Sequence, residues 1–124
     1  MIVKEIMKRP FVVDKDISLA EAAGMMSNKG IGSLVFMSGN KIKGIVTESD
    51  LVKSFGKHEK ISKICSTKVT TIKSEDSLDK ALEIMRAKKI KRLPVVDSDK
   101  LAGIITLTDI MANFESLDGD FFFG

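Results

Sequence analysis

The stretch GIVTESD, from Gly44 to Asp50, occurs a second time as GIITLTD, from Gly103 to Asp109. Both copies keep a glycine, two β-branched apolar residues, a threonine and an aspartate in the same order. The β-branched residues favour a strand. Threonine with an acidic residue three positions later is the pattern of a capping box, which begins a helix. The pattern therefore predicts, in each copy, a strand that passes directly into a helix.

The repeat extends well beyond this stretch. Aligned at the spacing that separates Gly44 from Gly103, residues 18–50 and 77–109 share twelve identical pairs, and Ile6 pairs with Ile64 after a one-residue shift. Repetition on this scale indicates one structural unit used twice. We expect an α/β (α+β) fold of two pseudo-symmetric β-α-β-β-α motifs packed as one compact unit. The predicted boundaries are 1–57 for the first motif, 58–116 for the second and 117–124 for a C-terminal tail.

The spacing of apolar residues places the elements within each half. Helices are predicted after Ser18 and after Ser77, because apolar residues recur there on one helical face. Ser18 and Glu21 form a capping box, whereas Lys80 replaces the glutamate at the second helix, so that only half of the device remains. The predicted strands, in chain order, are 11–13, 33–37, 42–46, 69–72, 93–97 and 101–105, and a further helix begins near Thr47 and near Thr106.

The composition limits the classes of function. The chain has 124 residues, 44% hydrophobic and 30% charged, which is typical of a soluble globular protein. With one cysteine and one histidine, neither an intrachain disulfide, a zinc site nor a Cys–His nucleophile can be assembled. A net charge of +3 is too small for a nucleic-acid-binding footprint. The N-terminus lacks an apolar signal core and no apolar run reaches the length of a membrane span, so we expect a cytoplasmic protein.

The repeated Thr-x-x-Asp has two interpretations. In one, Thr47 with Asp50 and Thr106 with Asp109 only cap helices. In the other they bind a ligand, because each helix begins at the carboxyl end of a strand, where α/β folds place ligands, and a carboxylate can accept the two hydroxyls of a ribose. Basic residues that could hold a phosphate stand at 91–92 in the second half.

The ordered set of motifs resembles a tandem pair of CBS (cystathionine β-synthase) domains, a stand-alone Bateman-type module. The matching stretches are VKEIMKRPFVV, SLAEAAGMMSNKGIGSLVF and GIVTESDL in the first half, and ICSTKVTTIKSEDSLDKALEIMRAKKIKRLPVVD and GIITLTDI in the second. The resemblance implies a non-catalytic regulatory module that binds an adenosine-containing ligand in clefts between the motifs. The implied ligand is AMP, ADP or ATP, with S-adenosylmethionine and NAD as the alternatives. It further implies a homodimer that signals to an effector protein. The small net charge makes nucleic acid an unfavoured partner, and no membrane partner is expected.

The resemblance also assigns roles to single residues. Asp50 and Asp109 would hold ribose hydroxyls, and Ser66 would lie near the ribose-phosphate of its own half. Other residues would contact ribose, phosphate or adenine: Val12, Gly32, Ser33, Thr47 and Ser49 in the first half, and Val69, Thr70, Lys91, Arg92, Pro94, Thr106 and Thr108 in the second.

The two predicted sites differ in charge. Gly32 and Ser33 stand where the second half has Lys91 and Arg92, and Glu48 stands where it has Leu107. Because an additional carboxylate disfavours a phosphate, we expect the site at Thr106 and Asp109 to be the one that binds.

Two other classes of function remain open. An enzyme would need a base, a nucleophile or a metal site, and none is found in the sequence. A ligand-free protein-interaction or nucleic-acid-binding module would keep the fold with empty clefts. The tail with Phe121 to Phe123 either docks on its own chain or a neighbour, or is disordered.

Overall fold

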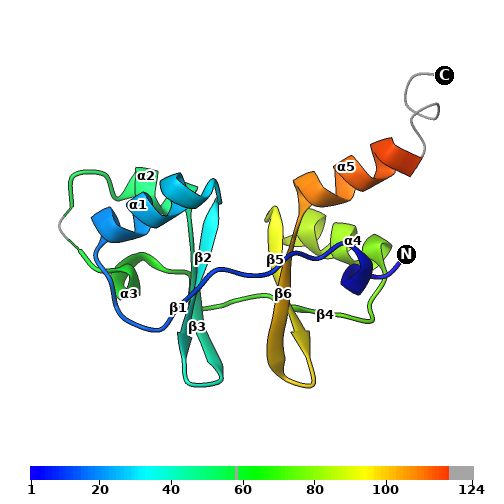
Figure 1. Ribbon diagram of the computed structural model, residues 1–124, viewed down its shortest axis with the longest axis horizontal. Helices are drawn as coiled ribbons and strands as arrows, with labels where there is room; N and C mark the ends of the chain where they lie inside the picture. Colours follow the sequence, from blue (N-terminus) through cyan, green and yellow to red (C-terminus); the bar gives the residue numbers. More distant parts are fainter. Residues whose placement is uncertain (58, 118–124) are drawn as a thin grey trace. The chain divides into compact units, whose positions relative to one another are not determined.

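The computed structural model describes residues 1–57 and 59–117, so the predicted tail with Phe121 to Phe123 lies outside the described residues. The chain forms two compact units (Figure 1). The first unit contains residues 10–69, and the second contains residues 1–9 together with the chain from Thr70 onward. Each unit holds one three-stranded sheet with helices packed on it, which confirms the mixed α and β class predicted from the sequence.

Both units contain the order strand, helix, strand, strand, helix, to which the first unit adds α3 and the second adds η1. The first unit contains β1 (Val12–Val13), α1 (Leu19–Lys29), β2 (Ser33–Ser38), β3 (Lys41–Thr47), α2 (Glu48–Lys53) and α3 (Ile61–Ile64). The second contains η1 (Val3–Glu5), β4 (Ile72–Lys73), α4 (Leu78–Lys88), β5 (Arg92–Asp97), β6 (Lys100–Thr106) and α5 (Leu107–Leu117). None of the helices in the described part of the chain combines the length and apolar character needed to cross a bilayer.

The sheets share one topology, in the orders β1-β2-β3 and β4-β5-β6. In each, an antiparallel hairpin is extended by a short parallel strand. The outer strands are shorter than the predicted segments 11–13 and 69–72, because only two residues of each pair with the hairpin. The remaining residues belong to the connections between the elements.

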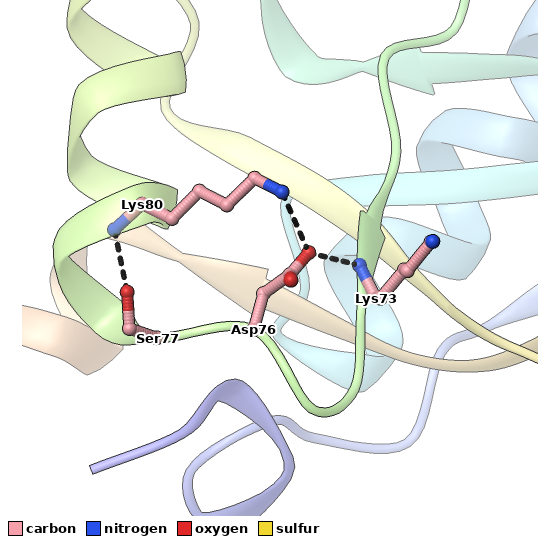
Figure 2. Close-up of polar contacts among 4 residues, drawn as sticks. All are labelled: Lys73, Asp76, Ser77 and Lys80. Carbon is pink, nitrogen blue, oxygen red and sulfur yellow. Dashed lines mark hydrogen bonds and ion pairs between the residues drawn. The ribbon is translucent and has the colours of Figure 1, made fainter.

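Side-chain caps begin the helices α1 and α4. At α1 the Ser18 hydroxyl accepts from Glu21 N (3.1 Å), and the Glu21 carboxylate accepts from Ser18 N, which completes the predicted capping box. At α4 the Ser77 hydroxyl accepts from Lys80 N at 3.1 Å (Figure 2). The neighbouring Asp76 accepts from Lys73 N at 3.1 Å, and its Oδ2 lies 3.4 Å from Lys80 Nζ. The predicted half-cap at Ser77 is therefore confirmed, and the lysine that replaces the glutamate pairs with the preceding aspartate.

Each sheet buries one face against its own helices. In the first unit Leu34 and Val46 are paired across the hairpin and pack with α1, whereas Leu93 and Ile105 do the same with α4. Successive strand residues point to opposite faces, so the alternate pairs lie on the second face of each sheet. Those pairs are Ser33 with Thr47 and Val35 with Ile45, and Arg92 with Thr106 and Pro94 with Ile104.

Two connecting segments cross onto the sheet of the opposite motif. Lys8 belongs to the first motif in sequence but pairs with Ile104 of β6, whereas Ser66 belongs to the second motif but pairs with Ile45 of β3. This exchange explains the glycine in each repeat. A Cβ at Gly44 would lie 2.8 Å from Ser66 O, and a Cβ at Gly103 would lie 2.9 Å from Lys8 O. Glycine is required because the backbones approach too closely for a side chain.

The helices that end each motif differ in length. α2 ends at Lys53, and the turn that follows leaves the ring of Phe55 91% exposed. α5 continues to Leu117, so its counterpart Phe114 packs on the core of the second unit. The first unit consequently exposes an aromatic ring whose counterpart in the second unit is partly buried.

Candidate functional site

The first Thr-x-x-Asp forms a complete capping box. Asp50 Oδ2 accepts from Thr47 N (2.9 Å), and Thr47 Oγ1 accepts from Asp50 N (3.3 Å). The next amide, Glu48 N, donates to Gly32 O at 3.1 Å. One oxygen of the Asp50 carboxylate therefore accepts a hydrogen bond at the start of α2, and Glu48 adds a second acidic residue to the same turn.

The second Thr-x-x-Asp has the same backbone geometry but a different carboxylate. Thr106 Oγ1 accepts from Asp109 N at 3.1 Å, so the threonine caps α5. In the described part of the chain the Asp109 carboxylate makes no bond back to Thr106 N, and its Oδ1 instead lies 2.9 Å from Lys8 Nζ. The Asp109 side chain is 15% exposed and that of Lys8 is 70% exposed. The carboxylate is thus a sheltered group held by a solvent-exposed cation.

The second face of the β4-β5-β6 sheet brings several predicted residues together. Arg92 is directly opposite Thr106 in the antiparallel register, so their side chains share a face. Leu107 N donates to Lys91 O at 2.8 Å, which places the Lys91 backbone at the start of α5. Thr108 is exposed in the first turn of that helix, and Pro94 is buried beside Ile104. The structure therefore brings Lys91, Arg92 and Thr106 together around the start of α5.

The corresponding face of the first unit is less basic. Ser33 is opposite Thr47 in the position that Arg92 occupies in the second unit. Ser49 is exposed in the first turn of α2, and Val12 lies on β1 with 45% of its surface exposed. Val69 and Thr70 are half-buried at the boundary between the two units in the chain, one in each unit.

A sequence model of the CBS domain matches residues 3–57 and 61–116. The chain belongs to the CBS domain family. Inosine-5′-monophosphate dehydrogenase of Nitrosopumilus maritimus is 36% identical over 110 residues, which cover 87% of this chain and 23% of that protein. The CBS domain-containing protein YhcV of Bacillus subtilis is 27% identical over 106 residues, 82% of this chain and 76% of YhcV. The chain thus spans less than a quarter of the dehydrogenase.

Solved CBS structures have the same fold. The CBS domain pair of protein MJ0100, in complex with 5′-methylthioadenosine and S-adenosyl-L-methionine, superposes with a TM-score of 0.89 at 29% identity, over 95% of this chain and 98% of that one. CBSX2 in complex with AMP superposes with a TM-score of 0.82 at 22% identity, over 94% and 97% of the two chains. The second likeness is one of fold alone.

The structure shows which sheet Ser66 joins, because Ser66 N donates to Ile45 O (3.0 Å) on the sheet of the first motif. Its predicted place near the ribose-phosphate of its own CBS motif stays a prediction. The equivalent place on the second motif is taken by Lys8, which the sequence prediction missed. The signal was available, because the alignment of Ile6 with Ile64 makes Lys8 the counterpart of Ser66. The contact between Lys8 and Asp109 could not be inferred from this alignment, because an alignment does not reveal which sheet each segment joins.

Cys65 is the cysteine of the chain and lies beside α3 of the first unit. Burial raises the pKa of the half-buried Cys65 thiol, and the charges of Asp16 and Asp50 raise it further, so the thiolate is disfavoured. Within residues 1–57 and 59–117, no three His, Cys, Asp or Glu side chains gather as a metal site would need. The chemistry that this arrangement supports is the binding of hydroxyls and anions.

Proposed function

We propose that this CBS pair is a non-catalytic regulatory module that binds an adenine nucleotide at its second motif. The observation that carries the proposal is the Asp109 carboxylate. It lies at the carboxyl end of β6, is 15% exposed and is free of the helix cap. A carboxylate in this place can accept both hydroxyls of a ribose. The complex of MJ0100 with adenosine-containing molecules supports a ligand of this class.

The charges favour a phosphorylated ligand at the second motif. Arg92 stands at the beginning of β5, opposite Thr106, and Lys91 precedes it. An arginine can bind a phosphate through two parallel hydrogen bonds. At the first motif Ser33 replaces the arginine, and Glu48 adds negative charge. We therefore assign AMP, ADP or ATP to the second motif, ahead of S-adenosylmethionine and NAD.

A homodimer is the second part of the proposal. Val52 is 75% exposed on α2, and Phe55 follows it with 91% of its surface exposed. A groove between α1 and α2, lined by apolar residues that include Met26 and Leu51, adjoins Val52. Exposed apolar groups beside a groove are typical of an association surface. We propose that two copies of the chain associate through this surface in the cytoplasm and pass the ligand signal to an effector protein.

The test is a thermal-shift panel with AMP, ADP, ATP, S-adenosylmethionine and NAD. A ligand at a hundredfold excess over its dissociation constant stabilises the native state by about 2.7 kcal/mol, which raises Tm by several degrees. Asp109→Ala should abolish the shift. This variant leaves the α5 cap in place, because Thr106 Oγ1 accepts from the Asp109 backbone and not from its side chain. Asp97→Ala, on the exposed hairpin of the same unit, is the matched control.

The panel separates the alternatives. A shift that survives Asp109→Ala and disappears in Asp50→Ala would move the site to the first motif. No shift with any ligand would refute the adenosine proposal. Salt-sensitive binding of RNA or DNA would then favour a nucleic-acid-binding module, because such binding depends on counterion release.

A further inference from the structure

The two CBS motifs carry different charges at one equivalent position. Lys8 and Ser66 occupy corresponding places in the repeat, and each pairs with the middle of the strand that leads to a Thr-x-x-Asp. At the second motif the occupant is a cation whose Nζ lies 2.9 Å from Asp109 Oδ1. At the first it is a neutral hydroxyl, and the Asp50 carboxylate bonds to Thr47 N instead. Two aspartates in closely similar sequence contexts therefore have different partners.

The backbone of Lys8 is held firmly while its ammonium group remains free to move. Lys8 N donates to Ile104 O (2.9 Å), and Ile104 N donates to Lys8 O (2.8 Å). Gly103 allows this close approach, since a Cβ there would lie 2.9 Å from Lys8 O. The side chain is 70% exposed, and a flexible lysine stem carries three donors on its end. The ammonium can thus leave Asp109 without leaving the site.

The ion pair is exposed on its lysine side, where 70% of the Lys8 side chain is accessible to solvent. Solvent screening and the entropy of the flexible lysine side chain reduce the net energy of such a pair. Lys8 can therefore be displaced from Asp109 at small cost when ribose hydroxyls occupy the carboxylate. A phosphate on the same ribose then offers the displaced ammonium a stronger, charge-assisted partner.

We propose that Lys8 is the specificity-determining residue of the second CBS motif, which selects phosphorylated adenosine over the uncharged nucleoside. Without ligand, Lys8 neutralises Asp109. With ligand, the ribose hydroxyls donate to the Asp109 carboxylate, and the Lys8 ammonium donates to the phosphate instead. The first motif has Ser66 in this position and lacks the selection. The inference rests on the proposed function and adds to it the residue that recognises the anion.

The experiment compares the affinities of AMP and adenosine by isothermal titration calorimetry. It uses the full chain carrying Asp50→Ala, so that binding at the second motif is measured alone. Lys8→Ser reproduces the residue of the first motif, and Lys8→Arg keeps the charge. Lys4→Ser is the matched control, because it removes an equal charge from an exposed position of the same segment.

The expected result is a change in selectivity. Loss of one charge-assisted hydrogen bond should weaken AMP binding by about tenfold in Lys8→Ser. Adenosine binding should stay equal or become tighter, because the ammonium no longer competes for Asp109. Lys8→Arg should retain most of the preference for AMP, and Lys4→Ser should bind both as the parent does.

Other outcomes overturn the inference. If AMP and adenosine weaken by the same factor in Lys8→Ser, Lys8 only shapes the site and does not select the phosphate. If neither affinity changes in Lys8→Ser, the phosphate is recognised by other residues. If the chain without any Lys8 substitution binds neither compound, the proposed function fails and the inference falls with it.

Discussion

Replacing Gly103 with alanine tests the segment exchange that builds the second site. The added Cβ would lie 2.7 Å from Met7 Sδ, 3.0 Å from Met7 Cγ and 2.9 Å from Lys8 O. The methionine can move, since its side chain is flexible. The Lys8 carbonyl cannot, because it accepts the hydrogen bond from Ile104 N at 2.8 Å. Either the bond lengthens or the whole segment shifts.

The cost follows from overpacking of a close contact. Forcing an extra carbon into a packed site costs about 1–3 kcal/mol, so we expect the free energy of unfolding to fall by about 2 kcal/mol. For a chain of this length the corresponding fall in Tm is about 8 °C. Gly44→Ala should behave in the same way, because its Cβ would lie 2.8 Å from Ser66 O and 2.7 Å from Cys65 Sγ.

The control is a glycine in open space. Gly24 lies inside α1, and a Cβ there has no neighbour within 4 Å. Gly24→Ala should raise the free energy of unfolding by about 0.5–1 kcal/mol, because alanine favours helix and restricts the unfolded chain. Urea unfolding followed by far-UV circular dichroism measures all three variants. If Gly103→Ala is as stable as the parent while Gly24→Ala is stabilised, Lys8 does not lie against β6 as described.

Three further predictions concern single groups outside the ligand site. Ser18→Ala should lower the free energy of unfolding by about 1 kcal/mol in urea, because the Ser18 hydroxyl caps α1 through Glu21 N at 3.1 Å; Ser27→Ala, in the same helix, should not. The Ser62 hydroxyl and backbone N–H donate to Asp16 and lower the pKa of its carboxyl group below the ordinary value of 3.8. The stability that this carboxylate contributes is therefore present above about pH 4 and is lost as the pH falls through the lowered pKa. Tm measured from pH 6 to pH 2 should therefore depend less on pH in Asp16→Asn, and an unchanged dependence would contradict the assignment. Because burial raises the pKa of the Cys65 thiol, iodoacetamide at pH 8 should alkylate it more slowly in the native chain than in urea, and equal rates would show that the thiol is open.

Much of the local structure follows from the sequence because its causes lie within a few residues. The cap at Ser18, the half-cap at Ser77 and the helix starts at Thr47 and Thr106 are contacts between positions three apart. The apolar spacing of α1 and α4 and the alternation in the hairpins are equally local. The repeat then requires that one arrangement be used twice, which is why the class of fold and the family were predictable.

The difference between the two aspartates was decided only by the tertiary structure. Asp50 and Asp109 stand in nearly identical stretches, and a local argument assigns them one role. Asp109 departs from that role because Lys8, from the opposite end of the chain, is held against Ile104 and reaches its carboxylate. The pairing of Ser66 with Ile45 on β3 could not be read from the sequence for the same reason. The pairing of a segment with the edge of a strand depends on contacts between residues distant in sequence. Only the folded chain brings such residues within hydrogen-bonding distance.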